Sequence, residues 1–160
     1  MTEPLLSDTE FDNNLNIRVI KLASKLILYM QRQAFRPVGL SGPEARILIN
    51  LARYGGTHVR ALSRYAGLDA SHISKVMPQM EKKGWVVRTK DKKDRRLVLF
   101  SMTDQGKAMF QTFWPDAQAL SQDVRNLFDE EEFNQLRDGI DRANDRLDAL
   151  LEEDVSLSGK

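Results

Sequence analysis

The side chains best suited to chemistry in this sequence form a charged run, Lys90 to Arg96, directly before an apolar stretch (KDKKDRRLVLFS, residues 90–101). All seven residues of the run are charged, and five of them are basic. The stretch that follows has the apolar pattern of a buried strand. A cationic tip that a strand anchors is suited to bind a polyanion, because each basic side chain that meets a phosphate releases counterions. An ordinary solvated charge run is the alternative interpretation.

A second group of polar side chains lies on residues 69–83, where the spacing of apolar residues predicts an amphipathic helix. Its apolar face consists of Ile73, Val76, Met77 and Met80. The opposite face presents hydroxyl, imidazole, ammonium and amide groups, on Ser71, His72, Ser74, Lys75 and Gln79. Such groups can read base edges in the major groove of DNA, where Gln suits adenine and Lys suits guanine. Each is also common on an ordinary helix surface, so the charged hairpin that follows favours the functional interpretation.

The sequence lacks the residues that nucleophilic catalysis by cysteine, zinc binding or nucleotide binding would need. There is no cysteine and there are two histidines, His58 and His72, so neither a thiolate nucleophile nor a zinc site is expected. The sequence shows no nucleotide-binding or hydrolase motif, and we expect no enzyme, no cofactor and no metal. It begins without a signal peptide pattern, and its longest apolar stretch, near LILYM, is too short to span a bilayer. These features predict a cytoplasmic protein that does not enter a membrane.

The net charge of +1 hides a division along the chain. Residues 57–115 hold 12 basic and five acidic side chains, whereas residues 116–160 hold five basic and 13 acidic ones. A basic middle and an acidic end predict a segregated electrostatic surface.

Helices must position these groups, because apolar residues recur at spacings of three and four along most of the chain. We expect helices over residues 12–35, from Ser41 to Gly55, from Thr57 to Gly67, from Asp69 or Ser71 to Gly84, from Thr103 to about Leu127, and over residues 130–150. Ser41 and Glu44 fit a capping box. Residues 85–88 and 97–101 predict the two strands of a hairpin. Pro78 should kink its helix locally, and Pro115 should bend or interrupt its own.

Two short helices followed by a basic hairpin have the order of a winged helix-turn-helix, in which the second helix enters the major groove. The expected fold class is mainly α with a small β-hairpin wing. The last helix repeats apolar residues at alternating steps of three and four from Phe133 to Leu150, as in a coiled-coil seam. This seam needs a partner, either the first helix or a second chain.

The stretch from Leu40 to Gly106 resembles the multiple antibiotic resistance regulator (MarR) family. The matching segments are LSGPEARILINL, VRALSRYAGLDASHISKVMPQMEKKGWVVR and DKKDRRLVLFSMTDQG. The strongest part is the D-x-R pattern of Asp94 to Arg96, followed by an apolar strand and by the T-x-x-G of Thr103 to Gly106. The long helices on either side also fit the family, so the resemblance covers nearly the whole chain.

The resemblance implies a DNA-binding lobe over residues 37–104, dimerisation helices over 1–36 and 105–154, and a tail over 155–160. In that family the wing arginine, here Arg96, reaches into or beside the minor groove, and the acid matching Asp94 supports it. The alternative role for Asp94 is that of a turn residue, which is common for aspartate. The expected DNA contacts are Ser71, His72, Ser74, Lys75, Gln79, Arg88, Lys92, Lys93, Asp94, Arg95 and Arg96. The expected dimer contacts are Leu15, Val19, Phe133, Leu136, Ile140, Leu147 and Leu150. A dimer would bind a pseudo-palindromic operator, with half-sites one helical turn apart.

Relatives in this family often release DNA when a small aromatic or phenolic acid binds. The residues that could line such a pocket are Arg18, Tyr29, Arg32, Arg46, His58 and Trp114, although the aromatic ones also suit a core or an interface. The resemblance therefore implies a dimeric, sequence-specific transcriptional repressor that a small effector releases. A winged-helix module that binds protein and an architectural DNA binder that senses nothing remain as alternatives.

Overall fold

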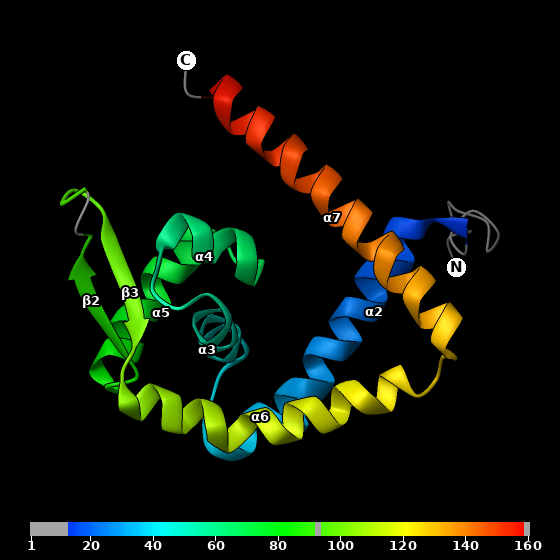
Figure 1. Cartoon of the computed structure of the whole chain (residues 1–160), viewed down its shortest axis with the longest axis horizontal. Helices are drawn as coiled ribbons and strands as arrows, with labels where there is room; N and C mark the ends of the chain where they lie inside the picture. Colours follow the sequence, from blue (N-terminus) through cyan, green and yellow to red (C-terminus); the bar gives the residue numbers. More distant parts are fainter. Residues whose placement is uncertain (1–12, 92–93, 159–160) are drawn as a thin grey trace, which may run out of the picture.

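A computed structural model describes residues 13–91 and 94–158, with the backbone alone over 152–158. It shows a mainly helical chain with one small sheet (Figure 1). The lobe between the terminal helices contains α3 (Gly42–Tyr54), β1 (Thr57–His58), α4 (Val59–Ala66), α5 (Ala70–Lys82), β2 (Val86–Lys90) and β3 (Val98–Met102). The elements outside the lobe are α2 (Leu15–Met30), the π-helical turn η1 (Gln31–Phe35), the 3₁₀ turn η2 (Arg36–Val38), α6 (Asp104–Arg125) and α7 (Glu130–Ser158). The expected fold class, mainly α with a hairpin wing, is confirmed.

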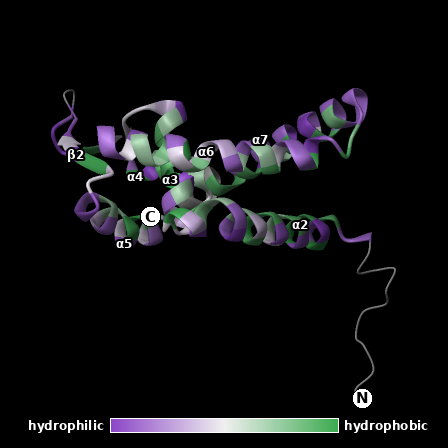
Figure 2. Cartoon of the chain, turned by 90° about the horizontal axis from the view of Figure 1, so that it is seen from below, coloured by the Kyte–Doolittle hydropathy of each residue, from purple (hydrophilic) through white to green (hydrophobic). Residues whose placement is uncertain are grey.

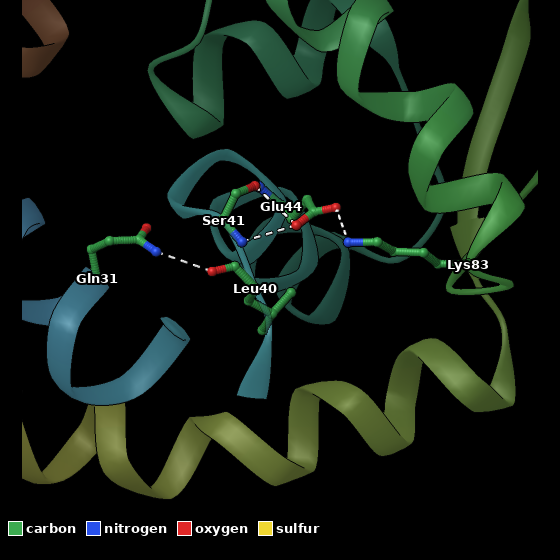
Figure 3. A network of polar contacts seen from close by, with 5 residues as sticks. All are labelled: Gln31, Leu40, Ser41, Glu44 and Lys83. Atoms are coloured by element: carbon green, nitrogen blue, oxygen red, sulfur yellow. Dashed lines mark hydrogen bonds and ion pairs between the residues drawn. The ribbon is translucent and has the colours of Figure 1, made fainter. Parts of the chain in front are cut away.

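The predicted capping box begins α3. The Ser41 hydroxyl accepts the Glu44 backbone N–H at 3.4 Å, and the Glu44 carboxylate accepts the Ser41 backbone N–H at 2.9 Å. The same carboxylate is buried, and it also accepts a hydrogen bond from Lys83 Nζ at 2.7 Å. Figure 3 shows that this contact joins α3 to the residue that follows α5. In the same network Gln31, in η1, donates to the Leu40 carbonyl at 3.0 Å, which joins the end of the first long helix to the lobe (Figure 3).

The sheet has three strands rather than the two that the hairpin pattern predicts. Its order is β1-β3-β2, with both pairs antiparallel. Thr57, expected to cap α4, is instead a buried residue of β1 opposite Phe100. His58 then occupies the N-cap position of α4 without a side-chain hydrogen bond to the helix. A β-branched threonine suits a half-buried strand, and this preference prevails over its capping ability.

Two prolines lie inside helices that continue through them. Pro115 was expected to bend or interrupt its helix, and the interruption does not occur, because α6 is continuous from Asp104 to Arg125. The helix α5 likewise extends past Pro78. Proline removes one backbone hydrogen bond but leaves the others, and buried Phe113 and Ala117 hold α6 against the lobe on both sides of Pro115. The first helix was expected over residues 12–35, but its α-helical part ends at Met30 and a π-helical turn follows.

Aromatic packing joins the lobe to the long helices. Phe113 of α6 is fully buried. Its ring packs edge-on against the rings of Phe35 and Phe110, with distances between ring centroids of 5.6 and 5.5 Å. Gly106 allows α6 to begin close to the sheet, because a Cβ there would collide with the Trp85 carbonyl. The T-x-x-G pattern thus has a steric cause in this chain, and Thr103 caps the same helix turn through its contact with the Gly106 N–H at 3.1 Å.

The helices α2 and α7 leave apolar side chains uncovered. They cross in the view of Figure 1 but are separated in Figure 2, where hydrophobic colouring continues along both. Within the described residues, no helix is long and apolar enough to cross a membrane.

Candidate nucleic-acid interface

The helix α5 presents one polar face to solvent. Its side chains Ile73, Met77 and Met80 are buried in the lobe. The five side chains expected to read bases, on Ser71, His72, Ser74, Lys75 and Gln79, are all exposed. The start of α5 is fixed by Asp69, which accepts the His72 backbone N–H at 2.7 Å. The amphipathic pattern therefore placed this face correctly.

Hydrogen bonds divide this polar face into two kinds of side chain. The Ser71 hydroxyl donates to Asp69 Oδ1 at 2.5 Å, and the Ser74 hydroxyl donates to the Ala70 carbonyl at 2.8 Å. The hydrogen bonds from Ser71 and from the His72 N–H lower the pKa of the Asp69 carboxyl. Among the contacts recorded between described residues, the Lys75 and Gln79 side chains have no partner. These two long side chains are the ones that α5 leaves available.

The wing is the antiparallel hairpin of β2 and β3. At its tip Asp94, Arg95 and Arg96 are exposed, while Lys92 and Lys93 lie outside the described residues. Asp94 Oδ1 accepts the backbone N–H of Arg96 at 3.0 Å, and the Asp94 N–H in turn donates to Asp91 Oδ1 at 3.1 Å. Asp94 thus acts as a turn residue. It bonds the backbone of Arg96, whereas support of the Arg96 side chain was the role that the family resemblance implied.

Arg88 at the base of the wing is not a free cation. Its Nε and Nη2 atoms donate to the two carboxylate oxygens of Glu81, at 3.0 and 2.5 Å. Arg88 was predicted as a DNA contact, whereas Glu81 was not expected to have a role. The available signal was the sequence order, since Glu81 lies in the last turn of α5 and Arg88 follows in the next strand.

His58 lies beside the wing, away from the long helices. Its Nδ1 atom is 2.8 Å from the Val98 carbonyl oxygen, so the ring donates a proton to β3 from this nitrogen. Its Nε2 atom is 3.4 Å from a carboxylate oxygen of Asp91. His58 was expected in a ligand pocket beside the long helices, and the structure places it elsewhere.

A cavity of about 1010 Å³ lies between the end of α2, α6 and the start of α7. Tyr29 and Trp114 both line it, together with apolar residues that include Leu26, Phe133 and Leu136. Arg32 lines a second hollow on α2, which it shares with Tyr29.

The other arginines expected at this cavity do not line it. Arg46 Nη1 donates to the Ala66 and Gly67 carbonyls at 3.2 and 3.3 Å, which satisfies the end of α4. Arg18 lies on α2 and lines neither hollow. The expected ligand set therefore divides into Tyr29, Trp114 and Arg32 near the cavity and three residues elsewhere.

The residues expected at a dimer interface form exposed stripes on α2 and α7. The exposed members are Leu15, Val19, Leu136, Ile140, Leu147 and Leu150. Phe133 is half-buried beneath the guanidinium of Arg125, which lies 4.2 Å from the ring centroid. No described part of the same chain therefore covers the α7 stripe along most of its length.

Sequence comparison links this lobe to a known family. Residues 40–98 match the model of the MarR family. The chain is 29% identical over 110 residues to the uncharacterized HTH-type transcriptional regulator YwaE of Bacillus subtilis. This match covers 64% of this chain and 64% of YwaE. It is also 24% identical over 133 residues to the HTH-type transcriptional repressor MdtR of the same species, covering 83% of this chain and 81% of MdtR. The match to YwaE thus spans just under two thirds of that protein's length.

Solved structures share the fold at low sequence identity. AbsC, a MarR family transcriptional regulator from Streptomyces coelicolor, superposes with a TM-score of 0.77 at 20% identity, over 92% of this chain and 99% of AbsC. NadR in complex with 4-hydroxyphenylacetate superposes with a TM-score of 0.76 at 20% identity, over 89% of this chain and 98% of NadR. Bordetella bronchiseptica BpsR, whose DNA binding is regulated by 6-hydroxynicotinic acid, superposes with a TM-score of 0.74 at 16% identity, over 89% of this chain and 99% of BpsR. The family model matches residues 40–98, so the lobe that holds α5 and most of the wing belongs to the MarR family, and the fold of AbsC extends over the long helices as well.

Proposed function

We propose that this protein is a dimeric, sequence-specific DNA-binding transcriptional regulator that acts as a repressor. The observation that supports this most is the placement of two DNA-facing features on one rigid lobe. The helix α5 and the β2–β3 hairpin belong to the same lobe (Figure 1), and both contribute buried side chains to its core, Ile73, Met77 and Met80 from α5 and Val86 and Phe100 from the hairpin. A helix of this kind fits the major groove, and an arginine at a hairpin tip is attracted to a narrow minor groove.

In the proposed complex, α5 reads bases through Lys75 and Gln79, which have no partner among the described residues of the free protein. Ser71, His72 and Ser74 contribute at the edges of the same face. Lys92, Lys93 and Arg95 contact phosphates, and Arg96 enters the minor groove. Asp94 shapes the turn that presents Arg96. Most of the affinity then comes from phosphate contacts, and most of the specificity comes from α5.

The exposed stripes of α2 and α7 support a homodimer. Apolar stripes on two long helices are covered well by the same stripes of a second copy, as in two-fold helical interfaces. We assign dimerisation to residues 1–36 and 105–154 and DNA binding to residues 37–104. Two lobes related by a two-fold axis would meet half-sites about 34–36 Å apart, and the operator would be a pseudo-palindrome.

The cavity between α2, α6 and α7 is the proposed effector site. Its lining is mainly apolar and includes Tyr29 and Trp114, which suits an aromatic ring. Arg32, beside Tyr29 in the neighbouring hollow, would meet a carboxylate. The ligands of NadR and BpsR are small aromatic acids, which supports this class of effector. Because the cavity touches the dimer helices, an effector there would act by favouring a dimer whose α5 helices have the wrong spacing.

The experiment that tests this proposal is selection of duplexes from a randomised DNA pool by the purified protein, followed by fluorescence anisotropy titration at two salt concentrations. We expect a pseudo-palindromic consensus, and an affinity that falls steeply as salt rises. Binding without any consensus would favour an architectural DNA binder. Indifference to DNA in dilute buffer would favour a protein-interaction module and would reject the proposal.

A further inference from the structure

The end of α5 and the start of the wing are joined by a fork of two hydrogen bonds. Arg88 Nε and Nη2 donate to Glu81 Oε1 and Oε2 in parallel, at 3.0 and 2.5 Å. Two parallel bonds between planar groups fix their relative orientation as well as their distance. Glu81 lies one turn beyond the base-reading face, and Arg88 lies in the strand that leads to the tip. The pair therefore bridges the two features that must engage DNA together.

The packing around Arg88 places it on the side of the hairpin that faces α5. Arg88 is opposite Phe100 in the β2–β3 register, and its guanidinium lies 5.9 Å from the ring centroid of Phe100. Phe100 and Val86 are both buried, and Val86 shares a strand face with Arg88 because side chains alternate along a strand. The guanidinium is thus held between an aromatic ring of the wing and a carboxylate of α5.

Both charges of this pair are stabilised by their contact. The hydrogen bonds from Arg88 hold the pKa of the Glu81 carboxyl below its ordinary value, and Glu81 raises the pKa of Arg88. The pair consequently stays ionised at neutral pH. A carboxylate this close to a DNA-binding face would repel phosphates if it had no other task, so its presence calls for a function.

We propose that Glu81 and Arg88 are positioning residues that fix the wing relative to α5, so that both reach their grooves at once. This inference rests on the proposed DNA binding. It makes an unusual prediction, because removal of an acidic side chain from a DNA-binding surface should weaken binding. If Arg88 instead contacted phosphate directly, removal of Glu81 would free it and binding would become tighter.

The test compares four variants with the wild-type protein: Glu81→Gln, Arg88→Gln, the exchanged pair Glu81→Arg/Arg88→Glu, and the control Asp104→Asn. Asp104 is an exposed carboxylate at the start of α6, paired only with Lys107 among the contacts recorded between described residues. Two quantities are measured: affinity for the selected duplex, and amide hydrogen exchange over residues 86–90 and 98–102 in the free protein. Thermal melts check that each variant folds. If the exchanged pair is unfolded, Arg88→Lys is measured in its place, because lysine keeps the positive charge but cannot form the two parallel hydrogen bonds.

We expect Glu81→Gln to bind DNA up to about fivefold more weakly, the effect typical of an exposed pair, and to exchange faster in both strands. Arg88→Gln and Arg88→Lys should behave alike, whereas the exchanged pair should recover both quantities. Asp104→Asn should bind as well as the wild type or slightly better. Unchanged exchange together with equal or tighter DNA binding by Glu81→Gln would overturn the inference. A wild-type protein that ignored DNA would reject the proposed function, and the exchange rates would still decide whether the fork holds the wing.

Discussion

Individual side chains on α5 differ in how freely they can meet a base. Ser71 and Ser74 are already bonded to their own helix, at 2.5 and 2.8 Å, so contact with DNA would have to replace these bonds. Lys75 and Gln79 are exposed and would lose only their hydration. A side chain that exchanges water for a base gains more than one that must also break an internal bond.

Gln79→Ala should therefore relax sequence preference more than Ser74→Ala does. The loss of one good base contact is worth about 1–3 kcal/mol of discrimination against the wrong base. We expect this loss for Gln79→Ala and a smaller one for Ser74→Ala, with little change in affinity for random duplex. The measurement is a competition between the selected duplex and single-base variants. Equal specificity ratios in wild type and Gln79→Ala would show that this face does not read the DNA.

Arg96→Ala tests the tip of the wing. Arg96 is exposed and its backbone is held by Asp94, so the side chain can be removed without disturbing the core. We expect weaker binding and a slope of log Kd against log salt that is smaller by about one, as for the loss of one phosphate contact. Asp94→Ala should weaken binding through the turn and leave that slope unchanged. Unaltered affinity for Arg96→Ala would remove the wing from the interface.

At the level of residues, sequence patterns predicted faces better than pairings. The exposed side of α5 followed from the spacing of Ile73, Met77 and Met80, which are buried as expected. The partner of Arg88 did not follow, because a strand residue can meet any charge that the hairpin angle brings near it. His58 and Arg46 were assigned to a pocket by residue type alone, and tertiary geometry placed them against Val98 and the end of α4.

Among the elements, the link between α3 and the end of α5 carries a buried charge. Burial raises the pKa of Glu44, but hydrogen bonds from Lys83 and Ser41 outweigh this and hold the pKa below its ordinary value of 4.5. Because the folded pKa is the lower one, the carboxylate contributes stability above pH 4.5, and this contribution is lost as the pH falls through the folded pKa. This link joins the start of α3 to Lys83, the residue that follows α5 (Figure 3).

Glu44→Gln should lower the free energy of unfolding at pH 7 by about 1–2 kcal/mol, a modest value because Lys83 remains partly solvated. The variant should also lose less stability than the wild type as the pH falls below 4.5. Urea denaturation at pH 7 and at pH 4 measures both effects. Asp116→Asn, which removes an exposed carboxylate in the middle of α6, should leave both values unchanged. Parallel pH profiles for wild type and Glu44→Gln would show that this carboxyl does not couple protonation to folding.

The elements that sequence signals located best are those with local caps. Ser41 with Glu44 and Thr103 with Gly106 mark the starts of α3 and α6, as the sequence predicts. Thr57 is a local signal that failed, because its pairing with Phe100 depends on a strand more than 40 residues later in the sequence. Pro115 does not interrupt α6 for a similar reason, since packing of Phe113 against the lobe holds the helix together.

For the whole molecule, the exposed stripe of α7 is the feature with the largest consequence. The sequence predicted a seam but left open whether the first helix or a second chain covers it. The structure separates α2 from most of α7 and leaves Ile140, Leu147 and Leu150 exposed (Figure 2). The helix α2 of the same chain therefore does not cover this stripe, and a second copy of the protein is the proposed partner.

Leu147→Arg tests this partner. A cation in the middle of an apolar seam loses its hydration without gaining a partner, so the dimer should dissociate into monomers. Light scattering measures the mass, and circular dichroism checks that the lobe stays folded. Asp145→Arg is the matched control, because two residues along a helix turn the side chain by about 200°, to the opposite face. It should leave the mass unchanged.

The same pair of variants separates the dimer from DNA binding. A monomer meets one half-site, so Leu147→Arg should lose most of its affinity for the pseudo-palindrome, while its affinity for an isolated half-site should match that of the wild type. If the Leu147→Arg protein kept the wild-type mass, α7 would not form the interface. If instead it became monomeric and kept full affinity for the palindrome, each lobe would act alone, and the spacing between half-sites would carry no information.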